Sequence, residues 1–154
     1  MKRFPNRFFT FFSLTFQACT CLSAIIFIYA TLFLKTPPIV TNPQVTTFGF
    51  VLNKCYMRFR PNVDLTPLFN LNTKQIFLYA TMVTGKQHEM VWSKIVQLND
   101  IKKFYECVNN NYPFSVIEGA DKYRTIEFEL RANLFPFVGA MKDILIGKFK
   151  YTVK

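Results

Sequence analysis

The sequence has few of the residues that enzymes use for catalysis or metal binding. It contains one histidine, His88, four cysteines and five glycines in 154 residues. It has no CxxC pair that could start a zinc site, and no glycine-rich loop that could hold a phosphate. No nucleophile-elbow motif surrounds Ser93 or Ser115. We therefore expect no cofactor, no metal site and no catalytic residue.

The remaining route to catalysis is a Ser/His/Asp hydrolase, which would need His88 with Ser93 or Ser115 as the nucleophile. His88 lies in the polar stretch 84–89, which predicts a solvated loop histidine. Glu127 and Glu129 share one face of a predicted strand, a pattern more typical of a solvated face than of an acid/base pair. A membrane-tethered hydrolase is therefore the weaker hypothesis, and a binding or structural domain the stronger one.

Charge excludes another class. The net charge is +10, but the sequence has no Lys/Arg run and no RNA-binding fingerprint, so we expect no nucleic-acid partner. On a domain tethered to a membrane, a basic surface is most simply an attraction to lipid headgroups or to an acidic partner.

Cysteine usage leaves one question open. Cys55 and Cys107 are the two cysteines outside the apolar N-terminal stretch. In an oxidising compartment they could form a disulfide, or they could be two separate thiols. No Asn-x-Ser/Thr glycosylation acceptor is present.

One long apolar stretch dominates the N-terminal part of the chain. From Phe8 to Leu34 no residue is charged. A helix of this length would extend roughly 40 Å, enough to cross a hydrocarbon core of about 30 Å with some tilt. The stretch is about twice as long as the apolar core of a cleaved signal peptide, and Lys35-Thr36-Pro37-Pro38 does not resemble a cleavage site. We predict an uncleaved transmembrane signal anchor over residues 8–34.

Flanking charge predicts the orientation of this anchor. Lys2, Arg3 and Arg7 precede it, and Lys35 follows closely behind it. The positive-inside bias places residues 1–7 in the cytosol as a short tail and the rest of the chain across the membrane. Residues 35–47 include three prolines and predict a semi-rigid stalk, followed by one domain over residues 48–154.

Alternating apolar residues predict a mainly β domain. The expected strands are 48–59 (a strand or strand pair), 74–83, 91–98, 112–117, 123–131 and 143–153. We predict a hairpin over residues 74–98, a turn at residues 118–121, and a connection containing proline and glycine over residues 132–143. Asn99-Asp100 is a helix-start signal, and Ile101, Phe104, Cys107 and Val108 follow at helical spacing. The prediction is an antiparallel β-sandwich with one short helix at 100–108.

Two segments carry a resemblance to a known family. Residues 64–79, DLTPLFNLNTKQIFLY, and residues 91–96, VWSKIV, followed by Asn99-Asp100, resemble the hallmark segments of signal peptidase complex subunit 3, the 22/23 kDa subunit. The overall plan of a short tail, one anchor and one domain is similar as well. Three features depart from the family pattern: Leu71 stands where the family often has Trp, a glycosylation acceptor is missing near 122–125, and the usual C-terminal tail is absent.

The resemblance implies a single-pass type II protein of the endoplasmic reticulum membrane with a lumenal domain. It implies a non-catalytic accessory subunit that supports a separate catalytic subunit in removing signal peptides from nascent secretory proteins. The implied partners are that catalytic subunit, the other subunits of the complex and membrane lipid. The alternative is a single-pass adhesion or receptor module with an immunoglobulin-like ectodomain, but the sequence lacks the Cys…Trp…Cys core and the glycosylation signals expected of one.

The strand 74–83 suggests where a partner could bind. Ile76, Leu78, Ala80 and Met82 should line the core, whereas Phe77 and Tyr79 on the opposite face mix aromatic and polar chemistry as interfaces do. Either the expected helix 100–108, or a partner or the membrane, would cover this second face. This face and the two family segments give the candidate contacts Phe69, Asn70, Gln75, Phe77, Tyr79 and Trp92.

Overall fold

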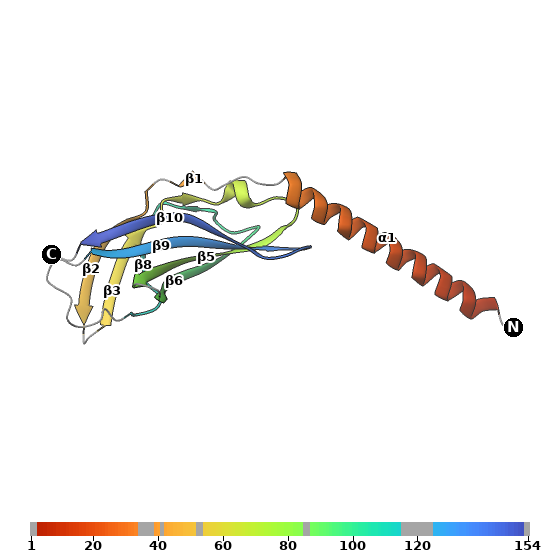
Figure 1. Cartoon of the computed structure of the whole chain (residues 1–154), viewed down its shortest axis with the longest axis horizontal. Helices are drawn as coiled ribbons and strands as arrows, with labels where there is room; N and C mark the ends of the chain where they lie inside the picture. Colours follow the sequence, from red (N-terminus) through yellow and green to blue (C-terminus); the bar gives the residue numbers. More distant parts are fainter. Residues whose placement is uncertain are drawn as a thin grey trace. The chain divides into compact units, whose positions relative to one another are not determined.

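The computed structural model describes residues 3–33, 39–40, 42–51, 54–84, 87–114 and 125–152. The chain divides into two compact units, Met1–Lys35 and Thr36–Lys154, and we call the second unit the β domain (Figure 1). The first unit contains helix α1, Arg3–Phe33. Within it, residues Arg7–Ala30 form a helix long and apolar enough to cross a membrane.

Two threonines of helix α1 form hydrogen bonds within the helix itself. The hydroxyl of Thr15 donates to the carbonyl of Phe11 at 2.9 Å, and that of Thr20 donates to the carbonyl of Phe16 at 2.8 Å. Such bonds to the preceding turn satisfy a hydroxyl within the helix itself. They explain how an apolar anchor can contain threonine. One N-terminal apolar helix able to span a membrane is therefore confirmed.

The β domain consists of antiparallel sheets. Its elements are β1 (Ile39–Val40), β2 (Gln44–Val51), β3 (Lys54–Arg60), β4 (Val63–Asp64), the 3-10 turn η1 (Thr66–Leu68), β5 (Thr73–Thr84), β6 (Gln87–Gln97), β7 (Lys103–Phe104), β8 (Val108–Asn109), β9 (Thr125–Pro136) and β10 (Lys142–Thr152). They form a four-stranded sheet in the order β10-β9-β5-β6 and two three-stranded sheets, β2-β3-β8 and β1-β4-β7. The mainly β, antiparallel class is confirmed, as are the strand pair within 48–59 and the hairpin within 74–98.

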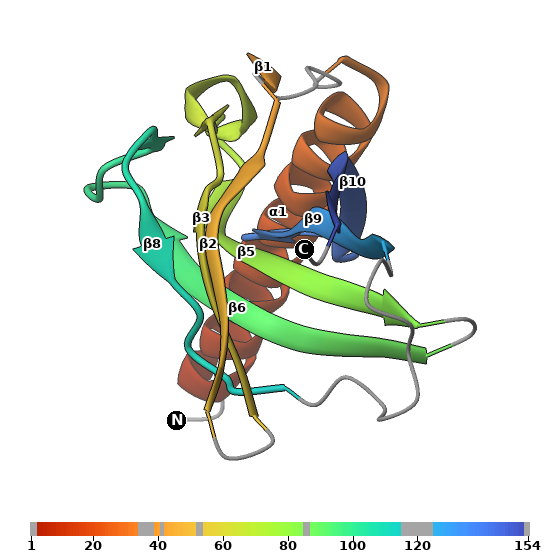
Figure 2. The ribbon, with the colours of Figure 1, turned by 90° about the vertical axis from the view of Figure 1, so that its left-hand side faces the viewer.

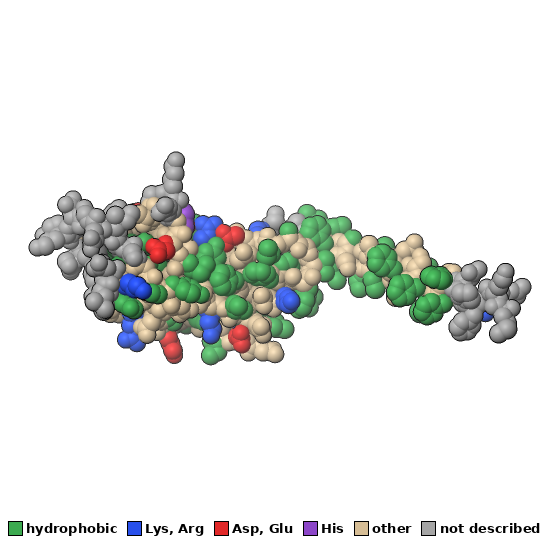
Figure 3. Space-filling model, turned by 90° about the horizontal axis from the view of Figure 1, so that it is seen from below, with side chains coloured by type: hydrophobic (Ala, Val, Ile, Leu, Met, Phe, Trp, Pro, Cys, Tyr) green, Lys and Arg blue, Asp and Glu red, His purple; other side chains and the backbone are tan. Residues whose placement is uncertain are grey.

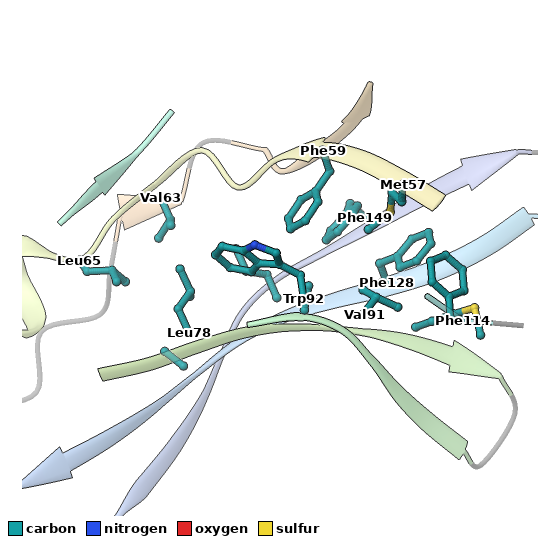
Figure 4. Close-up of a cluster of buried hydrophobic side chains, with 14 of the residues drawn as sticks. Met57, Phe59, Val63, Leu65, Leu78, Val91, Trp92, Phe114, Phe128 and Phe149 are labelled. Carbon is teal, nitrogen blue, oxygen red and sulfur yellow. The ribbon is translucent and has the colours of Figure 1, made fainter. Parts of the chain in front are cut away.

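The core lies between the four-stranded sheet and the sheet β2-β3-β8, whose strands form two layers in Figure 2. Phe59 from β3 stacks on Phe149 from β10 with ring centroids 5.8 Å apart, and Phe149 stacks on Phe128 from β9 at 5.3 Å. The ring of Trp92 meets Phe59 edge-on at 5.5 Å (Figure 4). Burying large aromatic rings from both layers is worth about 1.5–3 kcal/mol each, so this cluster holds the two sheets together.

The predicted helix at 100–108 is wrong. These residues contain two short strands, β7 and β8, which belong to different sheets. The Asn99-Asp100 signal has another use: Asp100 Oδ2 accepts the backbone N–H of Gln97 at 2.8 Å, and the N–H of Asp100 donates to the carbonyl of Gln97 at 3.1 Å. Asp100 thus closes a turn at the end of β6. The short helical element of the described β domain is η1 instead.

Three other boundaries differ from the prediction. The connection expected at 132–143 is shorter, because β9 continues to Pro136 with Ala132 buried, and β10 begins at Lys142. Residues 39–40 and 44–47 of the expected stalk lie in β1 and β2. His88, expected in a loop, lies in β6. The turn expected at 118–121 and most of the strand expected at 112–117 lie outside the described residues, although Phe114 forms an isolated bridge with Cys55.

Candidate partner-binding face

The strand register brings together the side chains on the outer face of the four-stranded sheet. Phe77 of β5 lies between Ile95 of β6 and Asn133 of β9. Tyr79, two residues further along β5, lies between Ser93 of β6 and Arg131 of β9. Beyond β9, the positions on β10 that pair with this face are Asp143, Leu145, Lys148 and Lys150. We call these side chains, with Thr81, Glu127, Glu129 and His88, the outer face. Its core-side counterparts Ile76, Leu78, Ala80 and Met82 are buried, as predicted.

One half of the outer face is apolar. The rings of Phe77 and Tyr79 stack with centroids 5.4 Å apart and an interplanar angle of 25°. Ile95 beside them is 51 % exposed, and Leu145 on β10 is 43 % exposed. Figure 3 shows hydrophobic side chains gathered over the middle of one side of the β domain, with charged side chains spread among them. An ordered apolar surface of this kind is typical of a protein-binding site.

Hydrogen bonds fix the aromatic pair in place. The phenol of Tyr79 donates to Asp143 Oδ1 at 3.0 Å, and Nε of Arg131 donates to Asp143 Oδ2 at 2.9 Å. Partial burial, with the neighbouring Asp143 carboxylate, raises the pKa of Tyr79. The ring therefore stays a neutral phenol, and its orientation is set before any partner arrives. Preorganised aromatic side chains lose little entropy when they are covered.

The other half of the outer face carries a buried carboxylate. Glu129 is 6 % exposed and accepts Nζ of Lys148 at 2.9 Å and Nη1 of Arg131 at 3.0 Å. The hydrogen bond from Lys148 is the main reason that the pKa of Glu129 is lowered. A carboxylate held in its charged form by two cations is a poor general base, because it has little tendency to take up a proton. The group stabilises the sheet and does not suggest catalysis.

The described residues do not bring the side chains of a hydrolase site together. Nδ1 of His88 lies 4.0 Å from Oε2 of Glu129. Ser93, one of the two candidate nucleophiles, shares a hydrogen bond with the phenol of Tyr112 at 3.1 Å. Ser115 lies outside the described residues. In the part of the chain that the structure describes, no serine has the contact with His88 that nucleophilic catalysis needs.

The remaining predicted contacts have mainly structural roles. Trp92 is 4 % exposed and belongs to the core, and it also lines a groove of about 900 Å³ between β6 and residues 100–111. Asn70 accepts the backbone N–H of Asn72 through Oδ1 at 2.8 Å and so shapes the turn before β5. Phe69 lies under the ammonium of Lys102, 5.0 Å from the ring centroid. Gln75, Phe77 and Tyr79 are half-buried on the outer face.

The topology residues are only partly described. Arg7 is exposed. The side chain of Arg3 and the whole of Lys2 lie outside the described part of the chain. Cys55 and Cys107 are thiols and do not form a disulfide. Cys55 is buried, and Sγ of Cys107 accepts Nε of Arg60 at 3.1 Å. Within the described residues no group of His, Cys, Asp and Glu could hold a metal ion.

Sequence reasoning missed several exposed apolar residues. Ile95 and Leu145 extend the aromatic pair, and their strand parity with Phe77 and Tyr79 was the signal that could have found them. Leu71, Phe137 and Met141 are also exposed. These three lie on turns, where apolar periodicity gives no signal.

Comparison with known proteins agrees with this plan. The chain matches the family described as "Signal peptidase subunit" over residues 1–154. It is similar to signal peptidase complex subunit 3 of Saccharomyces cerevisiae, 29 % identical over an alignment of 112 residues that covers 64 % of this chain and 58 % of the yeast protein. It is 32 % identical over 91 residues to the protein of the same name from Yarrowia lipolytica, covering 54 % of this chain and 49 % of that protein. The matches thus span about half the length of these two relatives. Because the family match covers the whole sequence given, the chain belongs to the signal peptidase subunit family.

Proposed function

We propose that this protein is a non-catalytic accessory subunit of the endoplasmic-reticulum signal peptidase complex. In this proposal the domain is lumenal, the anchor is type II, and the outer face binds the catalytic subunit during removal of signal peptides from nascent secretory proteins. The observation that carries the proposal is the ordered apolar half of the outer face around Phe77 and Tyr79. Family membership supports it.

The apolar area of these side chains and their ordered arrangement on the sheet both favour binding. Phe77, Tyr79, Ile95 and Leu145 come from three strands of the same four-stranded sheet, β5, β6 and β10, so the sheet itself holds them in register. Each large apolar side chain that becomes fully buried contributes about 1.5–3 kcal/mol. Side chains that are already half-buried contribute less than that when they are covered. A few such side chains together can still supply much of the binding free energy of an interface.

The binding test compares two charges on adjacent residues of β5. Phe77→Asp places a carboxylate on the outer face, where water can solvate it, and should release the catalytic subunit while the domain still melts cooperatively. Leu78→Asp places the same charge in the core, where Leu78 is fully buried, and should unfold the domain. Co-purification of the peptidase and thermal melting are measured for both variants.

Tyr56→Asp is the matched control, because Tyr56 is an exposed aromatic residue on β3, away from the outer face. It should retain the peptidase. If Phe77→Asp keeps the full amount of the catalytic subunit, or if Tyr56→Asp loses it equally, the outer face is not the binding site.

Orientation and lack of catalysis need separate tests. Because Arg7 and the basic residues before it favour a cytosolic N-terminus, protease added to intact microsomes should leave residues 48–154 protected. Digestion of the domain from the cytosolic side would contradict the proposed orientation. The purified full chain should not cleave a signal-peptide substrate, and cleavage that Ser93→Ala abolishes would contradict the accessory role.

A further inference from the structure

A group of large apolar side chains projects from two turns at one end of the β domain. Leu71, in the turn before β5, is 95 % exposed. Phe137 and Met141, in the turn between β9 and β10, are 65 % and 63 % exposed. We call these three residues the apolar foot. Single exposed apolar residues need no explanation, but three on adjoining turns form a surface that water solvates poorly.

The two turns are fastened to each other by Asn72, which is buried. Its Nδ2 donates to the carbonyl of Val138 at 2.8 Å, and its Oδ1 accepts the N–H of Val138 at 3.0 Å. The backbone carbonyl of Asn72 accepts the N–H of Phe137 at 2.8 Å. The exposure of Leu71 and Phe137 is therefore built into an ordered, hydrogen-bonded structure.

Few residues connect the end of helix α1 to the first strand of the β domain. Helix α1 ends at Phe33, and β1 begins at Ile39. Even a fully extended chain between these two residues spans at most about 20 Å. Strand β1 pairs with β4, and Leu71 of the foot lies only seven residues after Asp64, where β4 ends.

The turn that carries Phe137 and Met141 lies at one particular end of the β domain. The turn between β9 and β10 lies at the far end of these strands from the C-terminus (Figure 1). This turn of the foot therefore lies at the end of the β domain opposite the C-terminus.

Positive charge flanks the foot. Lys74 follows the first turn, Lys142 follows the second, and both are exposed. Asp143, the acid next to Lys142, already binds Arg131 and Tyr79. Within the described residues neither lysine forms an ion pair. Lysine beside an apolar surface can extend its ammonium to lipid phosphates while its stem remains in contact with that surface.

We infer that the apolar foot inserts into the interfacial region of the membrane that holds the anchor. Leu71, Phe137 and Met141 enter the boundary between headgroups and acyl chains, and Lys74 and Lys142 contact anionic phosphates. The foot gives the β domain a second attachment to the membrane and limits its orientations. This inference concerns the purified chain and lipid alone, so it does not depend on the proposed binding of a catalytic subunit.

The experiment uses the full chain in nanodiscs of phosphatidylcholine with phosphatidylserine. The chain has a single tryptophan, Trp92, which is buried and supplies the background fluorescence. Phe137→Trp adds an indole at the foot, and lipids carrying a spin label near the headgroup quench an indole that enters the interface. We expect quenching at least about twofold greater than that of the parent protein, because interfacial insertion brings ring and label together.

Tyr56→Trp is the control, since Tyr56 is an exposed aromatic residue on β3 and outside the foot. It should be quenched no more than the parent. Lys74→Glu with Lys142→Glu should reduce quenching of the Phe137→Trp protein, whereas Lys54→Glu with Arg58→Glu should leave it unchanged. Thermal melts confirm that each variant is folded.

Three results would overturn the inference. One is quenching of the Phe137→Trp protein no greater than that of the parent. Another is equal quenching at the Tyr56 position, which would mean that the domain lies on the membrane without a preferred end. The third is shielding of the introduced indole only when the other subunits of the complex are added, which would assign the foot to a protein partner.

Discussion

The outer faces of the two packed sheets differ in whether their charged side chains form ion pairs. On the four-stranded sheet, Arg131 pairs with Asp143 and Glu129, Lys148 pairs with Glu129, and Lys150 pairs with Glu127. These cations of the face are matched by acids on the same strand or on the neighbouring strand. Because the charges are already paired, covering this face would not leave one of these cations without a counter-charge.

The sheet β2-β3-β8 carries a different face. Strand β3 buries Cys55, Met57 and Phe59 and turns Lys54, Tyr56, Arg58 and Arg60 outward. Within the described residues none of these three cations forms an ion pair. This face contributes to the net charge of the chain and would be costly to dehydrate. One β domain thus combines a partly apolar face whose charges are paired with a second face whose described cations form no ion pair.

The largest expected effect comes from removing the buried acid. Glu129→Ala should lower the free energy of unfolding by about 2–3 kcal/mol, because Arg131 and Lys148 lose their shared partner, although Arg131 keeps Asp143. The matched change on the other face, Arg58→Ala, should cost less than about 0.5 kcal/mol, since Arg58 is exposed and has no ion pair to lose. Denaturant unfolding of the full chain measures both. Equal losses would contradict the contrast between the faces.

Acid should weaken the four-stranded face in particular. The pKa of Glu129 is lowered in the folded protein from its ordinary value of 4.5. A lowered folded pKa contributes stability that is present above the ordinary pKa and is lost as pH falls through the folded pKa. Melting temperature should therefore decrease as pH falls below about 4.5, and the Glu129→Gln variant should show a shallower decrease. Parallel curves for the two proteins would show that other carboxylates dominate.

A smaller effect is expected from the exposed end of the same ion pair. The side chain of Lys148 is 61 % exposed, so water replaces much of what Lys148→Ala removes. The loss should be below about 1 kcal/mol, clearly less than for Glu129→Ala. The pair of variants separates the value of the buried acid from that of its exposed partner. A loss as large as that of Glu129→Ala would mean that Lys148 alone holds the carboxylate in the sheet.

The smallest effect concerns the hydrated face and is one of reactivity. Hydrogen bonds from Thr46 and Arg60 lower the pKa of Cys107. Arg60→Ala should raise that pKa and slow alkylation of Cys107 near neutral pH, because less of the thiol is ionised. Peptide mass spectrometry after a timed exposure to iodoacetamide measures this change, and buried Cys55 in the same protein serves as the unreactive reference. An unchanged alkylation rate would mean that Arg60 does not act on the thiol.

Much of the fold could be predicted because the strands obey a period of two. The sequence predicts strand β5 from the face of Ile76, Leu78, Ala80 and Met82 and the opposite face that begins with Phe77 and Tyr79, since a pattern of this kind needs no knowledge of the partner strands. The candidate pair Phe77 and Tyr79 came from the same pattern. What alternation cannot give is the lateral order of strands, so the approach of Leu145 and Arg131 to Tyr79 became visible only with the register.

The failures have a common physical cause. At 100–108 a helix-like spacing of Ile101 and Phe104 coincided with a genuine turn signal at Asp100, and the tertiary pairing of β7 and β8 decided the outcome. His88 was assigned to a loop because its neighbours are polar, but its backbone pairs with Val83 and its imidazole lies near Glu129. A polar sequence does not reveal that charged side chains satisfy one another across strands.

The turn closed by Asp100 has a consequence for aggregation. Strand β6 is an edge of the four-stranded sheet, and a bare edge invites another chain to add to it. Here Asp100 occupies the N–H of Gln97, the side-chain amide of Asn111 donates to the carbonyl of Ser93 at 2.7 Å, and the N–H of Asn111 donates to that of Val91 at 3.1 Å. Residues 100–111 thus occupy part of the free edge of β6. Replacing Asp100 or Asn111 by alanine is expected to free these backbone groups of β6 for pairing with another chain, an outcome that the self-association of the variants in solution would test.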